Sequence, residues 1–145
     1  MNKSIAIVVS QYNRSITDKL LEGALAHLLA SGIEEKQITL IHVPGAVEIP
    51  LAARLLAKSQ RYEAIICLGA VIRGDTDHYD YVCEQVSQGC QRVMLDHEIP
   101  VIFGVLTTTT VQQAEERVGG KMGHKGQEAA EAALAMMRVV EQILL

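Results

Sequence analysis

A short polar loop carries the most reactive combination of side chains in the sequence. Arg73-Gly-Asp-Thr-Asp-His78 follows an apolar run and precedes a predicted helix. Its glycine allows the backbone to approach a ligand closely, and the start of a helix favours phosphate and other anions. His78 has the chemistry to carry protons near neutral pH. Proton transfer beside a phosphate is one hypothesis. The alternative is that Asp75 and Asp77 only cap the helix and that His78 is a surface neighbour.

A second group of polar residues is basic, although the chain as a whole is acidic. Arg117, Lys121, His124 and Lys125 lie close together with glycines between them. Cations on a glycine-rich segment suit the binding of phosphate or carboxylate. A solvated loop with charges that cap a helix end explains the pattern equally well. The Lys125-Gly126 pair has neither the spacing nor the following Ser or Thr of a Walker phosphate-binding loop.

Two aromatic residues and one carboxylate complete the candidate site. Aromatic residues make up only 3% of the chain, and Tyr12 and Phe103 each lie at or near the end of a predicted strand. A planar heterocycle can stack on such a ring. Glu48 stands in the first turn of a predicted helix, where the helix dipole stabilises a carboxylate; in a cleft, the same group can bind polyol hydroxyls. Ordinary half-buried aromatics and a helix-capping glutamate are the alternatives.

Strand-like and helix-like segments alternate along the whole chain and must position these side chains. Short runs of branched apolar residues predict four strands, and longer stretches with apolar residues at helical spacing predict five helices. The strands are expected at 4–9, 37–43, 64–68 and 100–106; the helices are expected from Ser15 to Gly32, from Glu48, at about 80–94, at 111–118 and from Gly126 to near Leu145, with Ser15 and Asp18 as a capping box. This alternation predicts an α/β fold whose parallel sheet is covered on both faces.

Each predicted strand is followed by a segment rich in glycine or polar residues. These segments are 11–13, 44–48, 69–78 and 106–110. In an open parallel sheet, ligands bind outside the carboxyl ends of the strands. We therefore expect the four segments to converge in space and to form the functional site.

Composition limits the class of protein. The chain has 145 residues, which predicts one domain spanning 1–145. Its hydrophobic content of 49% and mean hydropathy of +0.18 are high for a small domain, which indicates that other subunits cover part of its surface. The net charge of −4 argues against a nucleic-acid-binding protein. Neither a signal peptide nor a membrane span is recognisable, so we expect no membrane association and a cytoplasmic location.

The cysteines suggest neither a disulfide framework nor a metal site. Cys67, Cys83 and Cys90 are odd in number and lack a paired spacing. Cys83 and Cys90 are expected on one helix, where seven residues correspond to roughly 10 Å of rise, too far for a disulfide. We therefore expect packed free thiols and no bound metal.

Five stretches, in this order and at this spacing, resemble one family. They are Ser10-Gln-Tyr-Asn13, Val43-Pro-Gly-Ala-Val-Glu-Ile-Pro50, Leu68-Gly-Ala-Val-Ile-Arg-Gly-Asp-Thr-Asp-His-Tyr-Asp-Tyr81, Phe103-Gly-Val-Leu-Thr107, and Gln113-Ala-Glu-Glu-Arg117 with Lys125-Gly126. Each stretch is weak alone, but together they are highly specific. Over essentially its whole length the chain resembles the lumazine synthases.

The resemblance implies a flavodoxin-like, three-layer αβα sandwich with a four-stranded parallel sheet. It implies that 5-amino-6-(D-ribitylamino)uracil condenses with 3,4-dihydroxy-2-butanone 4-phosphate to 6,7-dimethyl-8-ribityllumazine, with release of phosphate and water and without a metal or cofactor. It also implies a homo-oligomer, either a pentamer or a 60-subunit shell, with active sites between subunits. Riboflavin synthase is the candidate protein partner.

The resemblance also assigns roles by position. His78 matches the proton-transfer residue, and Tyr12 matches the aromatic that stacks on the pyrimidine ring. The ribitylaminouracil-binding residues would be Tyr12, Ala46, Val47, Glu48, Val71, Ile72 and Phe103, and the phosphate-binding residues Asp75, Thr76, Arg117 and Lys125. Phe103, Arg117 and Lys125 would come from the neighbouring subunit.

Three residues depart from the family pattern. Tyr12 stands where Phe or Trp is common, which keeps the stacking surface. Val47 replaces a common aromatic, which predicts looser packing around the ring or the ribityl chain. His124 replaces the Asn that usually precedes Lys-Gly, which places a pH-sensitive group near the phosphate.

Two other classes of function remain open because a fold alone does not determine activity. One is a non-enzymatic module that binds flavin or phosphate on the same scaffold. The other is a mainly structural shell subunit. The combination of His78 with the distant Arg117 favours an enzyme, since a simple binder needs an anion site but no proton shuttle.

Overall fold

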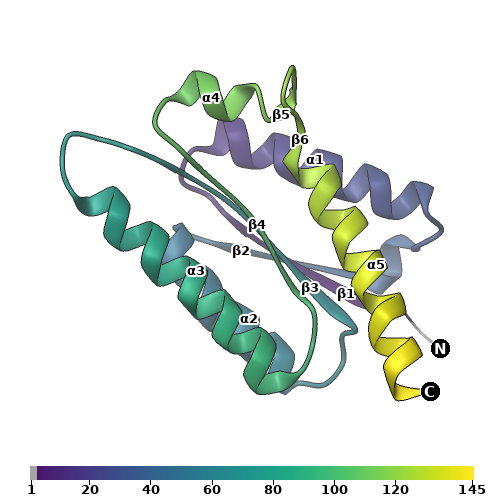
Figure 1. Ribbon diagram of the computed structural model, residues 1–145. Helices are drawn as coiled ribbons and strands as arrows, with labels where there is room; N and C mark the ends of the chain where they lie inside the picture. The colour runs from purple at the N-terminus through teal and green to yellow at the C-terminus, as the bar shows by residue number, and fades with distance from the viewer. Residues whose placement is uncertain (1–2) are drawn as a thin grey trace.

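The computed structural model describes residues 3–145, in which a parallel sheet lies between two layers of helices (Figure 1). The sheet contains four strands in the order β2-β1-β3-β4, all parallel. The strands are β1 (Ile5–Ser10), β2 (Ile38–Val43), β3 (Ala64–Ile72) and β4 (Val101–Thr108). The predicted α/β, flavodoxin-like, three-layer αβα sandwich is confirmed.

Each face of the sheet is covered by two helices. On one side lie α1 (Arg14–Ala30) and α5 (Lys125–Leu144), and on the other lie α2 (Ile49–Lys58) and α3 (His78–His97) (Figure 1). Strand β1 is buried along its whole length and alternates between two cores, with Ile7 facing α1 and α5 and Val8 facing α2 and α3. Apolar residues on both faces are what a parallel sheet between helix layers requires.

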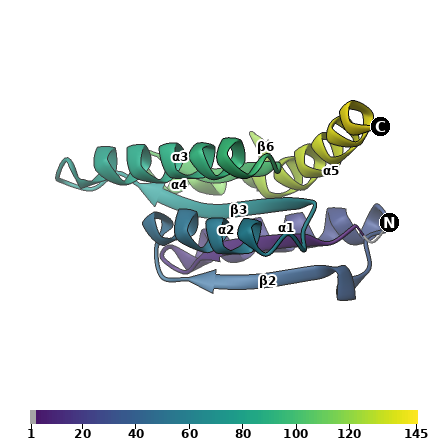
Figure 2. The same ribbon diagram turned by 90° about the horizontal axis from the view of Figure 1, so that it is seen from below.

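The chain changes direction across the sheet between β1 and β3. From β1 it moves outward to β2, and it then returns past β1 to β3 and β4. The arrowheads of β2 and β3 point the same way in Figure 2, and the segment leading into α3 lies beyond the end of β3. Such a reversal opens a crevice at the carboxyl ends of the two central strands, which is the usual ligand position in this class of fold.

Several element boundaries differ from the sequence-based predictions. Strand β3 does not end at Gly69 but continues to Ile72, because β4 pairs beside it as far as Thr108. Helix α3 begins two residues earlier than predicted, at His78, and extends to His97. The strand expected at 100–106 includes Thr107 and Thr108, which were predicted to lie in a capping segment.

The predicted capping box of Ser15 and Asp18 is wrong. Helix α1 begins at Arg14, and Asn13 at its N-cap has a left-handed backbone with φ 64° and no side-chain cap bond. The Asn13 amide Nδ2 instead donates a hydrogen bond to the Ala70 carbonyl, at 3.0 Å. Asparagine tolerates this conformation better than most residues. The start of α1 is therefore fixed by a tie to β3 rather than by a local cap.

The segment between β4 and α5 shows the largest departure. Helix α4 (Val111–Glu115) ends three residues early, and an antiparallel hairpin of β5 (Val118–Gly120) and β6 (Gly123–His124) occupies the stretch predicted as a glycine-rich loop. Strands this short and this rich in glycine, with Val118 as their one branched residue, lack the run of branched residues that marks a strand in a sequence. The hairpin lies beside α1 at the start of α5 (Figure 1).

Two further short elements and the cysteines complete the description. The 3-10 helices are η1 (Glu35–Gln37) and η2 (Ala46–Glu48). The three cysteines are free, with Cys67 and Cys90 buried and Cys83 half-buried, and Cys83 and Cys90 share α3 as predicted. The hydrogen bond with Cys90 and burial both raise the pKa of the Cys67 thiol well above its ordinary value. Between residues 3 and 145, the structure contains no helix long and apolar enough to cross a membrane.

Candidate functional site

The loops at the carboxyl ends of the four strands lie against one another, as the sequence predicted. After β1, the Gln11 amide donates to the Val43 carbonyl at 2.9 Å and the Tyr12 amide to the Pro44 carbonyl at 3.0 Å. Asn13 joins the same region to β3 through its bond to Ala70. The Arg73 amide, beyond β3, donates to the Thr108 carbonyl of β4 at 2.9 Å. Backbone bonds and the Asn13 side chain thus fix the relative positions of all four loops.

Tyr12, Gly45 and Glu48 form a compact group at the ends of β1 and β2, here called the ring group. A Cβ on Gly45 would lie 2.8 Å from the Tyr12 ring, so only glycine allows the ring to rest on this turn. The Glu48 Oε1 accepts the Gly45 amide at 3.2 Å, within η2. Tyr12 keeps 67% of its surface exposed, so the ring can receive a flat ligand.

The other residues predicted to bind the ring divide between buried and half-buried positions. Ala46 and Val71 are buried together in the core beneath α2 and α3, and Val47 is half-buried beside them in η2. Ile72 is half-buried on the opposite face of the sheet, against the core of α1 and α5. Glu48 lies at the start of a helix, as predicted: it is the last residue of the 3-10 helix η2 and the N-cap of α2.

Phe103 does not lie at the carboxyl edge of the sheet. It is the third residue of β4 and pairs with Cys67, whereas Val71 pairs with Thr107. Four residues of parallel strand span about 13 Å, so Phe103 lies well below the level of the ring group. The prediction that it lies near a strand end holds only for the amino end of β4. Within one chain it packs half-buried against the core under α2 and α3.

The β3–α3 loop (residues 73–77) is exposed, and so is His78 at the start of α3. The Thr76 Oγ1 accepts the His78 amide at 3.3 Å, while Asp77, at the N-cap, makes no side-chain cap bond. The bond to the helix start thus comes from Thr76. The alternative in which Asp75 and Asp77 serve as caps has no hydrogen bond to support it in the described residues, and both carboxylates are open to solvent.

Arg73 closes this loop at its base. Its Nη2 lies 2.9 Å from the Asp80 Oδ1, and its guanidinium carbon lies 4.5 Å from the centre of the Tyr79 ring. Burial raises the pKa of the Tyr79 phenol, and a hydrogen bond with Cys83 adds to this rise, while Thr107 and the Arg73 charge oppose it. Tyr79 therefore stays protonated at neutral pH, and Arg73 is held by the first turn of α3.

A cavity of about 300 Å³, here called the basic cavity, lies between the end of β4, the hairpin and the start of α5. Arg117 and Lys125 are its cations, and neither has a carboxylate within ion-pair distance in residues 3–145. The Arg117 Nη1 donates to the Gln113 carbonyl at 2.7 Å, which leaves its other donors available. The lining residues are Val105, Leu106, Thr107, Thr108, Arg117, Met122, Lys125 and Glu128.

The phosphate-binding residues expected from the resemblance therefore fall into two groups. Arg117 and Lys125 share the basic cavity, whose lining includes neither Asp75, Thr76 nor His78. A single chain presents a ring group, an exposed loop with His78, and a separate cationic cavity at the edge strand β4. The described residues of one chain therefore do not bring all the expected site residues into one pocket.

Sequence reasoning missed several residues that build these surfaces. Asn13 joins the first and third loops, and Thr107 and Glu128 are among the residues that line the basic cavity. The segment 106–110 was expected at the site, but its threonines were given no role beyond a helix cap. That role belongs to Thr110, whose Oγ1 accepts the Gln113 amide at 3.1 Å. Glu128 gave no signal, because it is one of many glutamates on a helix.

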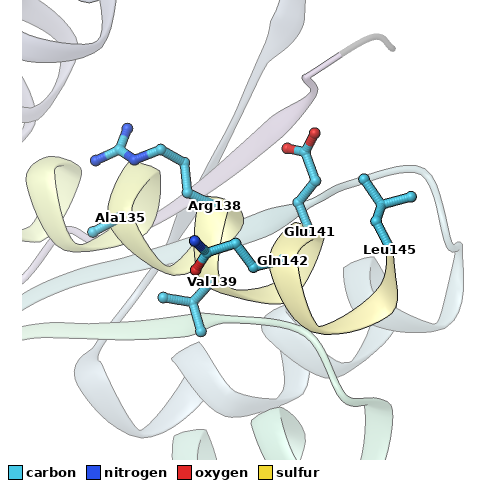
Figure 3. A pocket seen from close by; sticks show the side chains of 6 residues that line it. All are labelled: Ala135, Arg138, Val139, Glu141, Gln142 and Leu145. Carbon is cyan, nitrogen blue, oxygen red and sulfur yellow. The ribbon is translucent and has the colours of Figure 1, made fainter.

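A hollow of about 480 Å³ on α5 is not a candidate for the site. Its lining comes from the last turns of this one helix, and the labelled side chains point outward from it without a second element facing them (Figure 3). No predicted site residue is among them: they are Ala135, Arg138, Val139, Glu141, Gln142 and Leu145. In the described part of the chain, no cluster of three or more His, Cys, Asp or Glu side chains is placed to hold a metal ion.

Comparison with known proteins identifies the family. The family model described as 6,7-dimethyl-8-ribityllumazine synthase matches residues 2–141. Proteins with that name from Coxiella burnetii strains CbuG_Q212 and RSA 493 / Nine Mile phase I are each 58% identical to this chain over 139 residues. The aligned region covers 96% of this chain and 92% of each relative, and the relative from strain Dugway 5J108-111 aligns equally well. The chain therefore belongs to the 6,7-dimethyl-8-ribityllumazine synthase family of enzymes.

Proposed function

We propose that this enzyme condenses 5-amino-6-(D-ribitylamino)uracil with 3,4-dihydroxy-2-butanone 4-phosphate to 6,7-dimethyl-8-ribityllumazine, with release of phosphate and water. This is the penultimate step of riboflavin biosynthesis. The observation that carries the proposal is the pair of cations without an ion-pair partner in the described residues, Arg117 and Lys125, which share one cavity at the end of β4. A substrate whose phosphate leaves during the reaction needs such a group at the point where negative charge develops.

The ring group would bind the uracil substrate. Tyr12 would stack on the pyrimidine, since its ring is exposed and its position is fixed by the Gly45 turn. Glu48 would accept hydrogen bonds from the ribityl hydroxyls through the oxygen that does not hold the Gly45 amide. Ala46, Val47, Val71 and Ile72 would supply the apolar wall. Val47 is smaller than the aromatic residue common in the family, so the wall would fit the ligand more loosely.

His78 would transfer the protons that imine formation and dehydration require. It is exposed at the start of α3, and Thr76 holds its backbone, so the imidazole is free to reach a bound substrate. Asp75 and Thr76 would contribute loop groups to the phosphate, together with Arg117 and Lys125. Most of the remaining acceleration would come from holding the two substrates together, which is worth up to about 7–11 kcal/mol in ideal cases.

We propose that the site forms between subunits. Phe103, Arg117 and Lys125 lie on or beside the edge strand β4, away from the ring group, and would serve the site of an adjacent protomer. Apolar side chains exposed on α2 and at the ends of α3 and α5 are consistent with extensive contact between copies. They include Leu51, Leu55, Leu95, Ile143 and Leu144. The assembly would be a pentamer or a shell of 60 subunits, which sedimentation velocity distinguishes.

The test is a spectroscopic assay with both substrates present. We expect the absorbance of the lumazine product to rise and inorganic phosphate to appear in equal amounts. Omission of either substrate should abolish both signals. Phosphate release without lumazine, or no reaction with fully assembled protein, would contradict the proposal. A cytoplasmic location and an association with riboflavin synthase remain predictions, tested by cell fractionation and by co-sedimentation with riboflavin synthase.

A further inference from the structure

His124 occupies a structural position that the proposed chemistry does not use. It ends β6 and stands at the N-cap of α5, where its ring Nδ1 accepts the Gln127 amide at 3.3 Å. A ring nitrogen accepts a hydrogen bond only when it carries no proton. The N-terminal cap of the 20-residue helix α5 therefore depends on the protonation state of one half-buried imidazole.

The His124 ring also joins α5 to α1. It fills the space that a side chain on Gly23 of α1 would occupy, so that a Cβ there would collide with the ring. Two residues after His124, a Cβ on Gly126 would collide with the Leu20 backbone of the same helix. The first turn of α5 is thus pressed directly onto α1, and the imidazole fills the contact between them.

Both cations of the basic cavity are attached to this contact. Lys125 is the next residue after His124, and its amide donates to the Arg117 carbonyl at 2.7 Å. Val118, which follows Arg117, pairs with His124 across the hairpin. A shift of the His124 ring would therefore move the backbone of both cations, while the other wall of the cavity, at the end of β4, would stay in place.

We propose that His124 is a positioning residue for phosphate binding: its unprotonated ring caps α5 and holds Arg117 and Lys125 in register with the end of β4. This inference rests on the proposed function, because the anion in question is the phosphate of the sugar substrate or the phosphate released from it. Affinity for phosphate then falls as the ring gains a proton, since Nδ1 becomes a donor that faces the Gln127 amide.

Charged and titratable groups surround the ring on every element packed against it. The elements packed against it carry Lys19 and His27 one turn either side of Gly23 on α1, Lys125 and Glu128 on α5, and Arg117 and Lys121 on the hairpin side. Glu22, next to Gly23 on α1, and Glu116, against the hairpin, add two carboxylates, and the positive end of the α5 dipole lies at the same point. A direct role for His124 as a third phosphate-binding cation would have the opposite sign, with binding strengthened in acid.

The experiment measures the binding of inorganic phosphate by calorimetry to the assembled protein and to H124N and H124A, at about pH 8 and pH 5.5, which bracket the usual imidazole range. Asparagine is a good N-cap that does not titrate, and alanine is a poor one. At the higher pH we expect H124N to bind within about twofold of the parent protein and H124A about fivefold more weakly. At about pH 5.5, the phosphate affinity of the parent protein should fall towards that of H124A. The ratio of the affinities of H124N and H124A should stay the same as at about pH 8.

Because phosphate itself titrates in this range, the comparison uses ratios between variants at one pH. H42N, which alters an exposed histidine on β2, should follow the parent at both pH values. The proposal is overturned if H124N and the parent show the same pH dependence, or if the parent binds more tightly than H124N in acid.

Two further measurements keep the test independent of folding and of the proposed reaction. G23A should displace the His124 ring without altering it and should weaken phosphate binding as H124A does. In both G23A and H124A, the Gln127 amide should exchange its hydrogen faster than in the parent protein. Slow exchange of this amide in the two variants would refute the cap. Lumazine formation by the parent protein is assayed separately. If none forms while phosphate binding follows the predicted ratios, the proposed function fails and the role of His124 stands.

Discussion

The β3–α3 loop and the β5–β6 hairpin both appear as polar, glycine-containing segments in the sequence, yet they are built differently. The loop is exposed from Arg73 to His78 and is fastened mainly at its base, by the contacts of Arg73. The hairpin is held by backbone bonds to the segment at Arg117 and by a histidine packed on α1. Proton transfer needs an accessible group, whereas charge stabilisation needs donors that do not move.

The comparison predicts that the loop controls the chemical step. H78A should lower kcat by about a hundredfold or more, the usual range for a general acid–base residue, with little change in either KM. The measurement is steady-state lumazine formation together with sedimentation, which should show intact assembly. H42A provides a matched loss of an exposed imidazole. If H78A raises KM for the sugar phosphate and leaves kcat unaltered, the loop does not control the chemical step and the predicted difference between the two regions is wrong.

The hairpin region should control binding of the sugar phosphate. R117A removes a charged hydrogen-bond donor and should raise KM for 3,4-dihydroxy-2-butanone 4-phosphate roughly 10- to 100-fold, with a much smaller effect on the uracil substrate. Lys121 lies in the same segment but outside the lining of the basic cavity, so K121A is the control and should change KM little. Equal effects of R117A on both substrates would contradict the assignment.

Arg73 tests whether the loop needs its fastening. R73M removes the ion pair with Asp80 but keeps much of the bulk over Tyr79, and R73K keeps the charge but loses the planar stack. We expect R73M to lower kcat about fivefold and R73K less, because exposed ion pairs are individually weak. Neither should alter the affinity for inorganic phosphate. A large loss of that affinity in R73M would make Arg73 a direct phosphate ligand.

The smallest expected effect is an alkaline one at Tyr79. Because folding raises the pKa of this phenol, the contribution of Tyr79 to stability is complete below the ordinary value of 10.0 and declines as the pH rises above it. Y79F cannot ionise, so its Tm should fall less steeply than that of the parent protein between about pH 9 and 11. Thermal unfolding followed by circular dichroism across this range measures the difference. If Tm falls equally steeply with pH in Y79F and in the parent protein, folding does not raise the pKa of Tyr79.

The alternation of strands and helices was readable from the sequence because it depends on local periodicity. Ile5 to Val9 is continuously apolar, as a strand buried on both faces must be. The convergence of the loops followed from the same pattern, since parallel strands end at one edge. Boundaries were less accurate: β3 continues through Gly69 because its partner β4 runs beside it, which is a tertiary fact that the local sequence does not contain.

The candidate site was only partly predictable, because its geometry depends on contacts between distant segments. Nothing near Asn13 in the sequence indicates that its amide binds Ala70, and nothing near Gly23 indicates that a histidine about a hundred residues later packs against it. Phe103 is the clearest limit. The ring-binding role that the resemblance implies for it would need a neighbouring subunit, because one chain places it low on an edge strand.

The presence of Glu128 among the residues that line the basic cavity has a consequence for turnover. If the cavity binds phosphate as proposed, a carboxylate beside Arg117 and Lys125 would weaken the binding of every anion that enters, both the phosphorylated sugar and free phosphate. Tight retention of a leaving group would stall a catalyst, because the pocket must empty before the next substrate can dock. Glu128 would thus lower the affinity of the two cations for phosphate and speed its release.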